Sequence, residues 1–302
     1  MDWDDLRIFL QIARTGQIVE AARLLDLDHS TVSRRLSRLE EAVGAKLFNR
    51  AGRRLKINAS GRDLLSIASR VESLLLSEVG TITDEGGPVS GVVRIGAPEG
   101  LGAAYVSSHL DELRAGHESL EVELVALPQN YSLASREVDI AITLDRPRSG
   151  SVATRRLTNY GLGFFASADY LQRYGRPQAL EELADHRVCG YIPSLLHTPE
   201  LDYLDAVGVP LKAALRSTSI IAQRTMVETG QALGILPFFM VQPGASLIRL
   251  IPDFELKRSY WLSIHEDLRR QARVRVAAEA FASIIHRDHL LFSGTGPSNP
   301  QV

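Results

Sequence analysis

Hydroxyl and guanidinium side chains gather in one short segment, which runs from Asp28 to Glu40 and reads DHSTVSRRLSRLE. Asp28 is expected to cap a helix there, with its carboxylate accepting a backbone N–H bond in the first turn. Short hydroxyl side chains let a helix backbone approach a polyanion closely, and arginines reach phosphates or guanine edges. The pattern therefore favours double-stranded DNA as the partner. The residues predicted to contact it are His29, Ser30, Thr31, Ser33, Arg34, Ser37 and Arg38.

Three short helices, with a tight turn between the second and third, are expected to position this segment. Apolar residues at helical spacing predict a first helix that stops at Gly16 and a second helix over residues 18–25. The third helix is expected to end at Gly44. A helix pair joined in this way is a helix-turn-helix. Four apolar residues, in steps of four, three and four, are expected to form the buried face of the third helix: Val32, Leu36, Leu39 and Val43.

A basic hairpin, or wing, is predicted after the helices. Residues 46–62 hold six basic side chains and no acidic one, and a glycine in NRAGRRLKIN separates two short strand-like runs. A guanidinium group suits the negative potential of a minor groove. A single helix that exposes Arg and Ser is typical of any solvated surface. The helix pair, the cap and the basic wing together favour DNA as the partner. The wing residues predicted to contact it are Arg50, Arg53 and Arg54.

The chain is long enough, at 302 residues, for two or more domains, and its charge is unevenly distributed. Residues 1–62 contain 12 Lys and Arg against 8 Asp and Glu, whereas the remaining 240 residues contain 22 against 28. A basic module on an acidic body predicts a polyanionic partner for the first part alone.

The sequence lacks the signals of several other protein classes. Its single cysteine, Cys189, cannot form an internal disulfide and is expected to be buried. No apolar run reaches the length of a membrane span, and the acidic N-terminus lacks the form of a secretory signal, so a cytoplasmic protein without a membrane partner is expected. The eight histidines show no metal-ligand spacing. Since no nucleophile elbow, phosphate loop or convincing acid pair is present, no enzyme, metal or cofactor is predicted.

A longer amphipathic helix is expected after the wing, followed by a polar hinge with glycine and proline at residues 83–91. From Leu64 to Ile82 its seam positions alternate in steps of four and three, with the polar Glu78 as the one interruption, which is typical of a short intersubunit seam. The same periodicity suits a helix packed on its own domain, and spacing alone does not separate the two. The predicted seam residues are Leu64, Ala68, Val71, Leu75 and Ile82.

Beyond Gly91, strands are expected to alternate with helices, which predicts an α/β region with a largely parallel sheet and room for two small lobes. The tail after His289 is expected to be frayed. The predicted strands are 92–96, 120–127, 139–143, 161–166, 188–191 and 259–265, and the predicted helices are 102–115, 168–174, 220–229 and 269–287.

The N-terminal segment resembles the LysR-type transcriptional regulators nearly residue for residue. Similar pieces are Phe9 with Ala13, the pair Ala21-Ala22, Leu25, TVSRRLSRLE, and Gly44 with LFNR; more loosely, VVRIG, VDIAIT, GQALGILP and WLSIHED fit later landmarks. The resemblance implies a winged helix-turn-helix, a long linker helix, and a two-lobed α/β effector domain like periplasmic binding proteins. It also implies a homodimer or homotetramer and favours the seam. His29-Ser30 stand where the family commonly has Gln-Pro, which suggests an altered base preference.

The expected domains are a DNA-binding domain over 1–62, a linker over 63–90 and an effector-binding domain over 91–302. Within the last, lobe 1 is expected over about 91–163 and 267–302, and lobe 2 over about 164–266.

A small-molecule effector is expected in the cleft between these lobes, at the carboxyl ends of strands. APEGLG places Glu99 at a helix N-terminus, where families of this type often hold a carboxylate effector. A resident carboxylate there would repel an anionic ligand and favour a cationic or hydroxylated one; a simple cap facing solvent is equally consistent. The predicted effector-site residues are Glu99, Gly100, Leu101, Thr143, Ser217, Thr218 and Ser219.

The favoured function is a sequence-specific DNA-binding transcriptional regulator whose DNA engagement is modulated by that effector. Two other hypotheses are an enzyme tethered by the helix-turn-helix, and a small-molecule binding module whose helix-turn-helix contacts proteins.

Overall fold

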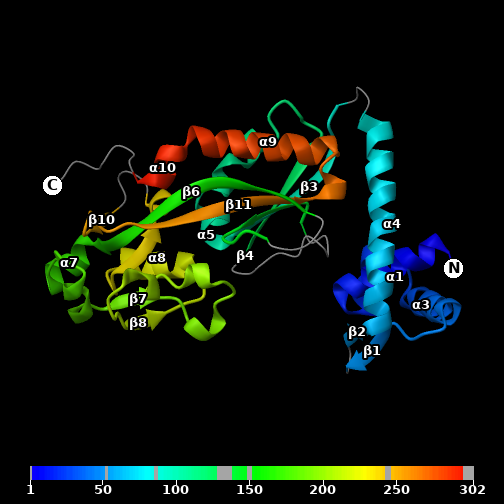
Figure 1. Cartoon of the computed structure of the whole chain (residues 1–302), viewed down its shortest axis with the longest axis horizontal. Coiled ribbons are helices and arrows are strands. Elements are labelled where there is room, and N and C mark those ends of the chain that lie inside the picture. Colours follow the sequence, from blue (N-terminus) through cyan, green and yellow to red (C-terminus); the bar gives the residue numbers. More distant parts are fainter. Residues whose placement is uncertain are drawn as a thin grey trace. The chain divides into compact units, whose positions relative to one another are not determined.

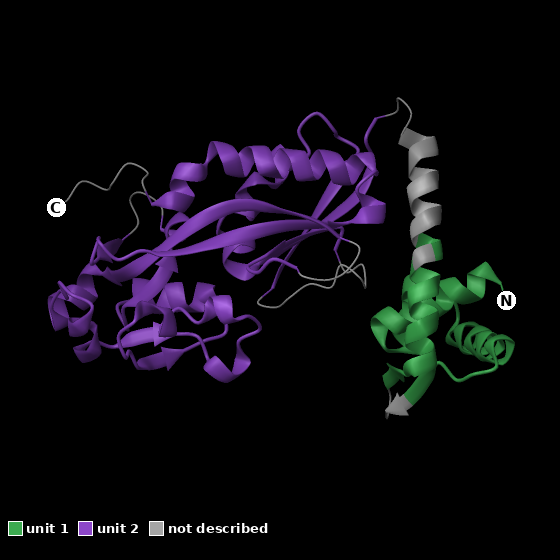
Figure 2. Cartoon of the chain, viewed as in Figure 1, with its two compact units in different colours: residues 1–83 green, residues 84–302 purple. Residues whose placement is uncertain are grey.

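The winged helix-turn-helix that the sequence predicts is present in the computed structural model of the chain (Figure 1). The structure describes residues 2–51, 54–84, 88–127, 138–147, 152–241 and 246–294, without the side chains of residues 50, 51, 70 and 73–84. The chain forms two compact units, residues 1–83 and 84–302 (Figure 2). The first unit contains α1 (Trp3–Thr15), α2 (Ile18–Leu25), α3 (His29–Val43), β1 (Phe48–Ala51), β2 (Arg54–Ile57) and α4 (Ala59–Asp84).

The buried face of α3 differs from the prediction at both ends of the helix. Val32, Leu36 and Leu39 are buried, but Val43 is 39% exposed because the helix ends there and the chain turns away at Gly44. Asp28 has the extended backbone of an N-cap, yet its carboxylate accepts no bond from the first turn. The predicted capping bond at Asp28 is therefore absent.

The start of α4 is packed tightly against the strand region that precedes it. Asn58 Oδ1 accepts from the Gly61 backbone N–H at 2.9 Å, and the Asn58 N–H donates to the Leu47 carbonyl at 3.0 Å. A Cβ at Gly61 would lie 2.2 Å from that Leu47 carbonyl oxygen. Only glycine fits this close approach of two backbones.

The second unit is built on a mixed seven-stranded sheet, in the order β10-β6-β11-β5-β3-β4 with β9 also paired to β6. Only β3 pairs in parallel, with β4 and β5; every other pairing in this sheet is antiparallel. The expectation of a largely parallel sheet is wrong. The strands are β3 (Gly91–Pro98), β4 (Leu120–Leu127), β5 (Ile140–Thr143), β6 (Val152–Ser167), β9 (Gly234–Pro237), β10 (Leu247–Leu250) and β11 (Leu256–His265).

A second, two-stranded parallel sheet, formed by β7 (Val188–Gly190) and β8 (Ala213–Arg216), belongs to the other lobe with α7 (Ala168–Tyr174) and α8 (Ile220–Glu228). Strand β6 runs without a break through residues 163 and 164, where the lobe boundary is expected. The long antiparallel pair of β6 and β11 therefore joins the two lobes (Figure 1).

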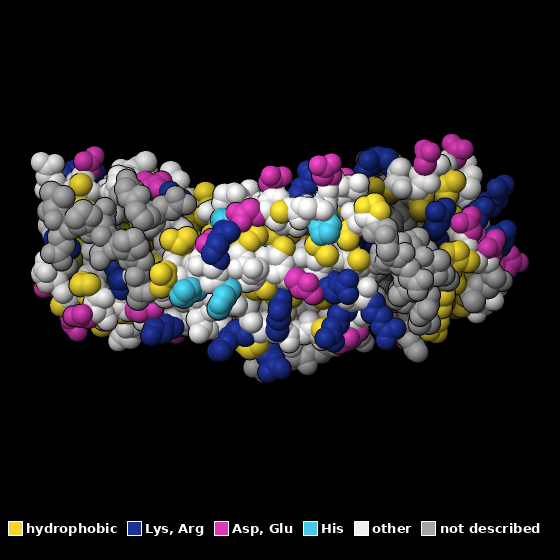
Figure 3. All heavy atoms as spheres, turned by 90° about the horizontal axis from the view of Figure 1, so that it is seen from above, with side chains coloured by type: hydrophobic (Ala, Val, Ile, Leu, Met, Phe, Trp, Pro, Cys, Tyr) yellow, Lys and Arg dark blue, Asp and Glu magenta, His cyan; other side chains and the backbone are white. Residues whose placement is uncertain are grey.

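The remaining helices lie on the faces of the large sheet. The predicted helix over 102–115 is instead α5 (Glu99–Ala104), a 3-10 turn (Val106–His109) and α6 (Leu110–Leu113). Helix α9 (Ala272–Arg287) packs on β3 and β6. In the view from above, several Lys and Arg side chains gather along one side of the molecule (Figure 3). After α9 the chain continues as α10 (His289–Ser293).

Residues 290–293 belong to a short helix, contrary to the expected fraying, and the rest of that tail, residues 295–302, lies outside the described residues. Phe292 is fully buried, with its ring centroid 4.9 Å from those of Tyr105 and Phe239. Burial of this large aromatic side chain helps to hold the short helix in place, although the tail has no periodicity that predicts it.

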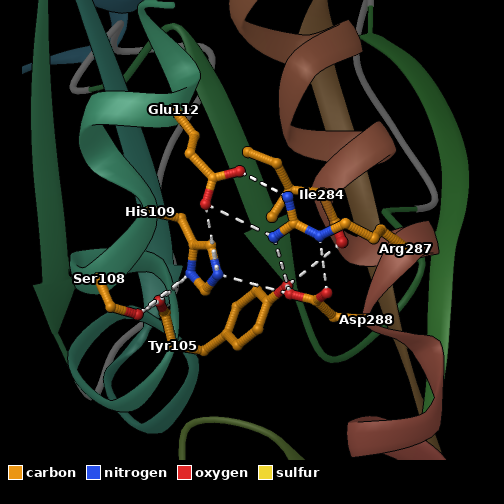
Figure 4. Close-up of polar contacts among 7 residues, drawn as sticks. All are labelled: Tyr105, Ser108, His109, Glu112, Ile284, Arg287 and Asp288. Carbon is orange, nitrogen blue, oxygen red and sulfur yellow. Dashed lines mark hydrogen bonds and ion pairs between the residues drawn. The ribbon is translucent and has the colours of Figure 1, made fainter.

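Polar contacts also hold the α5–α6 segment against α9 and α10 (Figure 4). The Tyr105 hydroxyl donates to Asp288 Oδ2 at 2.7 Å, and His109 Nε2 lies 3.4 Å from the same oxygen. Arg287 Nη1 lies 2.6 Å from Glu112 Oε2. Burial, and then the bond to Asp288, raise the pKa of Tyr105, so its phenol stays protonated and donates this bond.

We expect Gly61→Ala to destabilise the first unit by about 2 kcal/mol or more, because the added methyl group must push two backbones apart. The measurement is urea unfolding followed by Trp3 fluorescence in a Trp261→Phe background. Ser60→Ala, at the exposed neighbouring position, is the control and should change stability by less than about 0.5 kcal/mol. Equal effects of the two substitutions would contradict the close approach at Gly61.

Candidate functional site

The exposed face of α3 carries most of the residues predicted to contact DNA. His29, Ser30, Arg34 and Ser37 are exposed, and Thr31 and Ser33 are half-buried. Arg34 forms no ion pair with any residue that the structure describes. A guanidinium group in this state can bind phosphate or a guanine edge without first losing a protein partner.

The other two arginines of α3 are bound to acids at the start of α1. Arg38 reaches Asp5 through two hydrogen bonds, Nη2 to Oδ1 at 2.7 Å and Nε to Oδ2 at 3.0 Å. Arg35 bonds to Asp4 and lies 3.9 Å from the Asp5 carboxylate, which is 2% exposed. The hydrogen bond to Asp5 raises the pKa of Arg38. Arg38 therefore holds α3 against α1, and its predicted DNA contact stays a prediction.

These acids have a function that the sequence interpretation missed, since the acidic N-terminus was considered only as evidence against a secretory signal. Asp2 also caps α1, its Oδ1 accepting from the Asp4 N–H at 3.2 Å. Acidic residues in the first turn of one helix, and arginines on another helix of the same small domain, were the available signal.

The wing is a two-stranded antiparallel hairpin, with Phe48 opposite Ile57 and Ala51 opposite Arg54. Arg54 is exposed. The Arg50 side chain and all of Arg53 lie outside the described residues. Lys46, counted in the basic segment, is bonded to the buried Glu40 at 2.6 Å, so part of the positive charge there is already paired.

Two of the five predicted seam residues on α4 belong to the core of their own domain. Leu64 is 8% exposed and Ala68 is fully buried. They pack beneath the helix-turn-helix and are not available to a second subunit, so the alternative of a helix packed on its own domain holds for them. Val71 is 36% exposed, and Ile67, which was not predicted, is 56% exposed. The side chains of Leu75 and Ile82 lie outside the described residues.

In the effector unit, Glu99 joins α5 to the N-terminus of α8. Its Oε1 accepts from the Ser219 hydroxyl at 2.8 Å, and its Oε2 accepts from the Ile220 backbone N–H at 3.0 Å. Ser219 in turn caps α8, its Oγ accepting from the Ala222 N–H at 3.1 Å. Glu99 is half-buried and does not serve as a cap that faces solvent.

A small cavity of about 30 Å³ lies beside this carboxylate. Three predicted effector residues line it, namely Glu99, Gly100 and Thr218. The other lining residues are Pro98, Leu127, Leu144, Tyr191, His197, Leu201, Tyr203, Ile220, Pro237 and Tyr260.

The remaining predicted effector residues make structural contacts. Leu101 is fully buried in the core, and the Thr143 hydroxyl donates to the Asp145 carbonyl at 2.7 Å. Ser217 Oγ accepts from the Ser219 N–H at 3.1 Å, which shapes the turn before α8. These three residues, and also Ser219, are not among those that line the cavity beside Glu99.

A larger cavity, of about 480 Å³, lies in the lobe that contains β7 and β8. Tyr191, Leu201 and Tyr203 line both cavities. Cys189, at the larger cavity, is 1% exposed, which fits its expected burial, and this burial raises its pKa to about 12, so that the thiol is unreactive.

No cluster of three His, Cys, Asp or Glu residues suited to a metal ion exists in the part of the chain that the structure describes. Within the same ranges, no helix has the length and apolar character to cross a membrane.

We expect Asp5→Asn to lower the melting temperature of the first unit by several degrees. The neutral amide leaves Arg38 and Arg35 without their buried counter-charge, and α3 loses its hold on α1. Thermal unfolding monitored by Trp3 fluorescence measures this, and Asp63→Asn, an exposed acid on α4, is the matched control. Equal shifts in melting temperature for the two variants would show that the ion pairs at Asp5 stabilise the unit no more than an exposed acid does.

The chain matches two family models that together span most of its length. Residues 3–62 match the bacterial regulatory helix-turn-helix protein, lysR family, and residues 86–284 match the LysR substrate binding domain. The regulator CrgA of Neisseria meningitidis is 28% identical over 253 residues, which cover 82% of this chain and 84% of CrgA.

Solved structures of regulators share the fold. A full-length OxyR variant from Pseudomonas aeruginosa has a TM-score of 0.73 at 18% identity, covering 93% of this chain and 94% of that one. Full-length LysG from Corynebacterium glutamicum, with bound effector Arg, has a TM-score of 0.62 at 18% identity, covering 94% and 99%. With both domain models matched in order, the chain belongs to the LysR family of transcriptional regulators, proteins that bind DNA and small-molecule effectors and are not enzymes.

Proposed function

We propose that this regulator reads its operator with the exposed face of α3, and that Arg34 supplies the principal charged contact. The observation that supports this most is that Arg34 has no ion pair among the described residues and lies on a face with the exposed Ser30 and Ser37, whereas the other arginines of the helix are bound to α1. Serine side chains add little bulk, so the helix can lie deep in a major groove. Arg54 is placed at the adjacent backbone or minor groove.

Base discrimination is assigned to His29 and Ser33, at the beginning of α3. The N-terminal residues of a recognition helix are the ones that meet base edges in helix-turn-helix proteins. His29 is exposed, and Ser33 is half-buried one turn further on. The departure from Gln-Pro at residues 29–30 therefore bears on which operator is preferred.

The small-molecule effector is assigned to the cavity beside Glu99, where α5 of one lobe meets α8 of the other. A Cβ at Gly100 would lie 2.8 Å from Ile220 Cγ2, so the two helices are in close contact. A ligand that binds better to one arrangement of the lobes shifts the protein toward it. LysG is described with a bound effector, which supports a ligand site in this fold.

The functional form is proposed to be a homodimer, or a homotetramer built from it, that acts in the cytoplasm, where its DNA partner is. Two recognition helices of a dimer meet half-sites roughly 34 Å apart. With Leu64 and Ala68 inside the domain, the seam is reassigned to the exposed side of α4, which carries Ile67 and Val71. The helix-turn-helix as a protein-contact module is the other candidate, and salt dependence separates them.

We expect Arg34→Ala to weaken binding to most duplexes and to reduce the slope of log affinity against log salt concentration by about one, because one phosphate contact is lost. Fluorescence anisotropy with a labelled operator at several salt concentrations measures both. Arg270→Ala, an exposed arginine of the effector unit, is the control and should leave the slope unchanged. Absence of duplex binding by the unmodified protein at low salt would instead favour the protein-contact module.

We expect Val71→Glu to shift the sedimentation mass from dimer toward monomer, since a carboxylate in an apolar seam loses solvation without gaining a partner. Analytical ultracentrifugation measures this, with Ser66→Glu on the same helix as the control. An unchanged mass for Val71→Glu would remove the exposed side of α4 from the interface.

A further inference from the structure

The Glu99 carboxylate occupies a position that would otherwise attract an anion. The N-terminus of an α-helix binds anions because its first backbone N–H groups point outward and the helix dipole is positive there. At α8, a helix of nine residues, Glu99 accepts from the first of these groups and Ser219 from the third, at Ala222. The protein therefore fills this anion site with its own side chain.

A negative charge remains after this contact. A helix N-terminus carries about half a positive charge, whereas an ionised carboxylate carries a full negative one. Glu99 accepts two hydrogen bonds from described groups, and a carboxylate has about four acceptor positions. Both the charge and the free acceptor positions suit a cationic donor in the adjoining cavity.

The other walls of the cavity contain no Lys or Arg among the lining residues. Burial lowers the pKa of His197, which favours its neutral form. Burial, neighbouring phenols and the charge of Glu99 together raise the pKa of Tyr191, so this phenol is neutral as well. Among the lining residues that the structure describes, Glu99 is thus the one with an acidic side chain, and none has a basic side chain that pairs with it.

Three tyrosine rings, those of Tyr191, Tyr203 and Tyr260, line the same space. Aromatic faces attract organic cations, most strongly where water is excluded. Tyr160 stacks on Tyr260 with 4.3 Å between the ring centroids, which holds the Tyr260 ring in its place at the cavity.

We propose that the effector is an organic cation, with its ammonium group beside Glu99 and its apolar body against the tyrosine rings. This inference rests on the proposed placement of the effector at this cavity. The volume of about 30 Å³ admits the ammonium group alone in the present conformation. The cavity of about 480 Å³ has Tyr191, Leu201 and Tyr203 in common with it, and the proposal directs the apolar body toward these shared side chains.

The first experiment tests whether Glu99 fills an anion site. Glu99→Ala should lower the melting temperature of the full chain, and acetate at tens of millimolar should restore much of it by binding α8 in place of the lost carboxylate. Sodium chloride at matched ionic strength and the exposed-site variant Glu118→Ala are the controls. If acetate stabilised Glu99→Ala no more than the unmodified protein, the resident carboxylate would not be occupying an anion site.

The second experiment tests the class of ligand with benzylammonium and benzoate, which share a ring and differ in the sign of their charge. Isothermal titration calorimetry on the full chain should show benzylammonium binding at least tenfold more tightly than benzoate, and Glu99→Gln should abolish the difference. Tighter binding of benzoate, no binding of either probe, or a preference retained in Glu99→Gln would each overturn the proposal.

Operator binding measured with the same probes separates this inference from the proposed function. If benzylammonium binds at Glu99 but operator affinity is unchanged, the proposal that the ligand is a cation is supported, and the proposal that this cavity controls DNA binding is contradicted. If operator affinity responds to benzoate and not to benzylammonium, a small molecule does control DNA binding, but the proposal that it is a cation is wrong.

Discussion

The paired hydrogen bonds between Arg38 and the buried carboxylate of Asp5 are the contact on which the DNA-binding unit depends. They fix the angle between α1 and α3, together with the adjacent pair formed by Arg35 and Asp4. A bidentate guanidinium–carboxylate contact constrains orientation as well as distance. With two arginines held in this way, α3 presents Arg34 and a row of short hydroxyl side chains on a defined face.

In the effector unit, as in the DNA-binding unit, one carboxylate links two helices. Glu99 crosses from α5 to α8 and is bonded to both Ser219 and Ile220. Because the two helices belong to different lobes, the proposed effector would change the relation of the lobes by changing this contact. The long strands β6 and β11, which join the lobes, provide a continuous connection along which such a change can be accommodated.

Local patterns in the sequence predicted much of the fold, because helices of the first unit and strands such as β4 have their own periodicity. Helix α7 and strand β4 have the predicted bounds. The predictions of the fold that failed concern contacts between residues distant in the chain. The antiparallel pairing of β6 with β11 joins residues about a hundred positions apart, and the order of α10 comes from Phe292 packing on Tyr105 and Phe239.

The predictions for the site residues also failed where they depended on residues distant in the chain. Periodicity on α4 indicated that Leu64 and Ala68 are buried but could not say whether a partner subunit or their own domain covers them. The acids of α1 and the arginines of α3 are separated by more than thirty residues, so their pairing was not visible locally. Glu99 was predicted at a helix N-terminus, but the helix whose N–H groups it contacts is α8, about 120 residues later.

Affinity cleavage from α3 tests most directly whether this face lies against DNA. The single native cysteine, Cys189, is 1% exposed, so Ser37→Cys provides one accessible thiol for an iron chelate that cleaves nearby DNA. The account predicts cleavage centred on each operator half-site, and none above background from the same label on Lys212→Cys in the effector unit. Equal, diffuse cleavage from the two positions, on an operator shown to be bound, would contradict it.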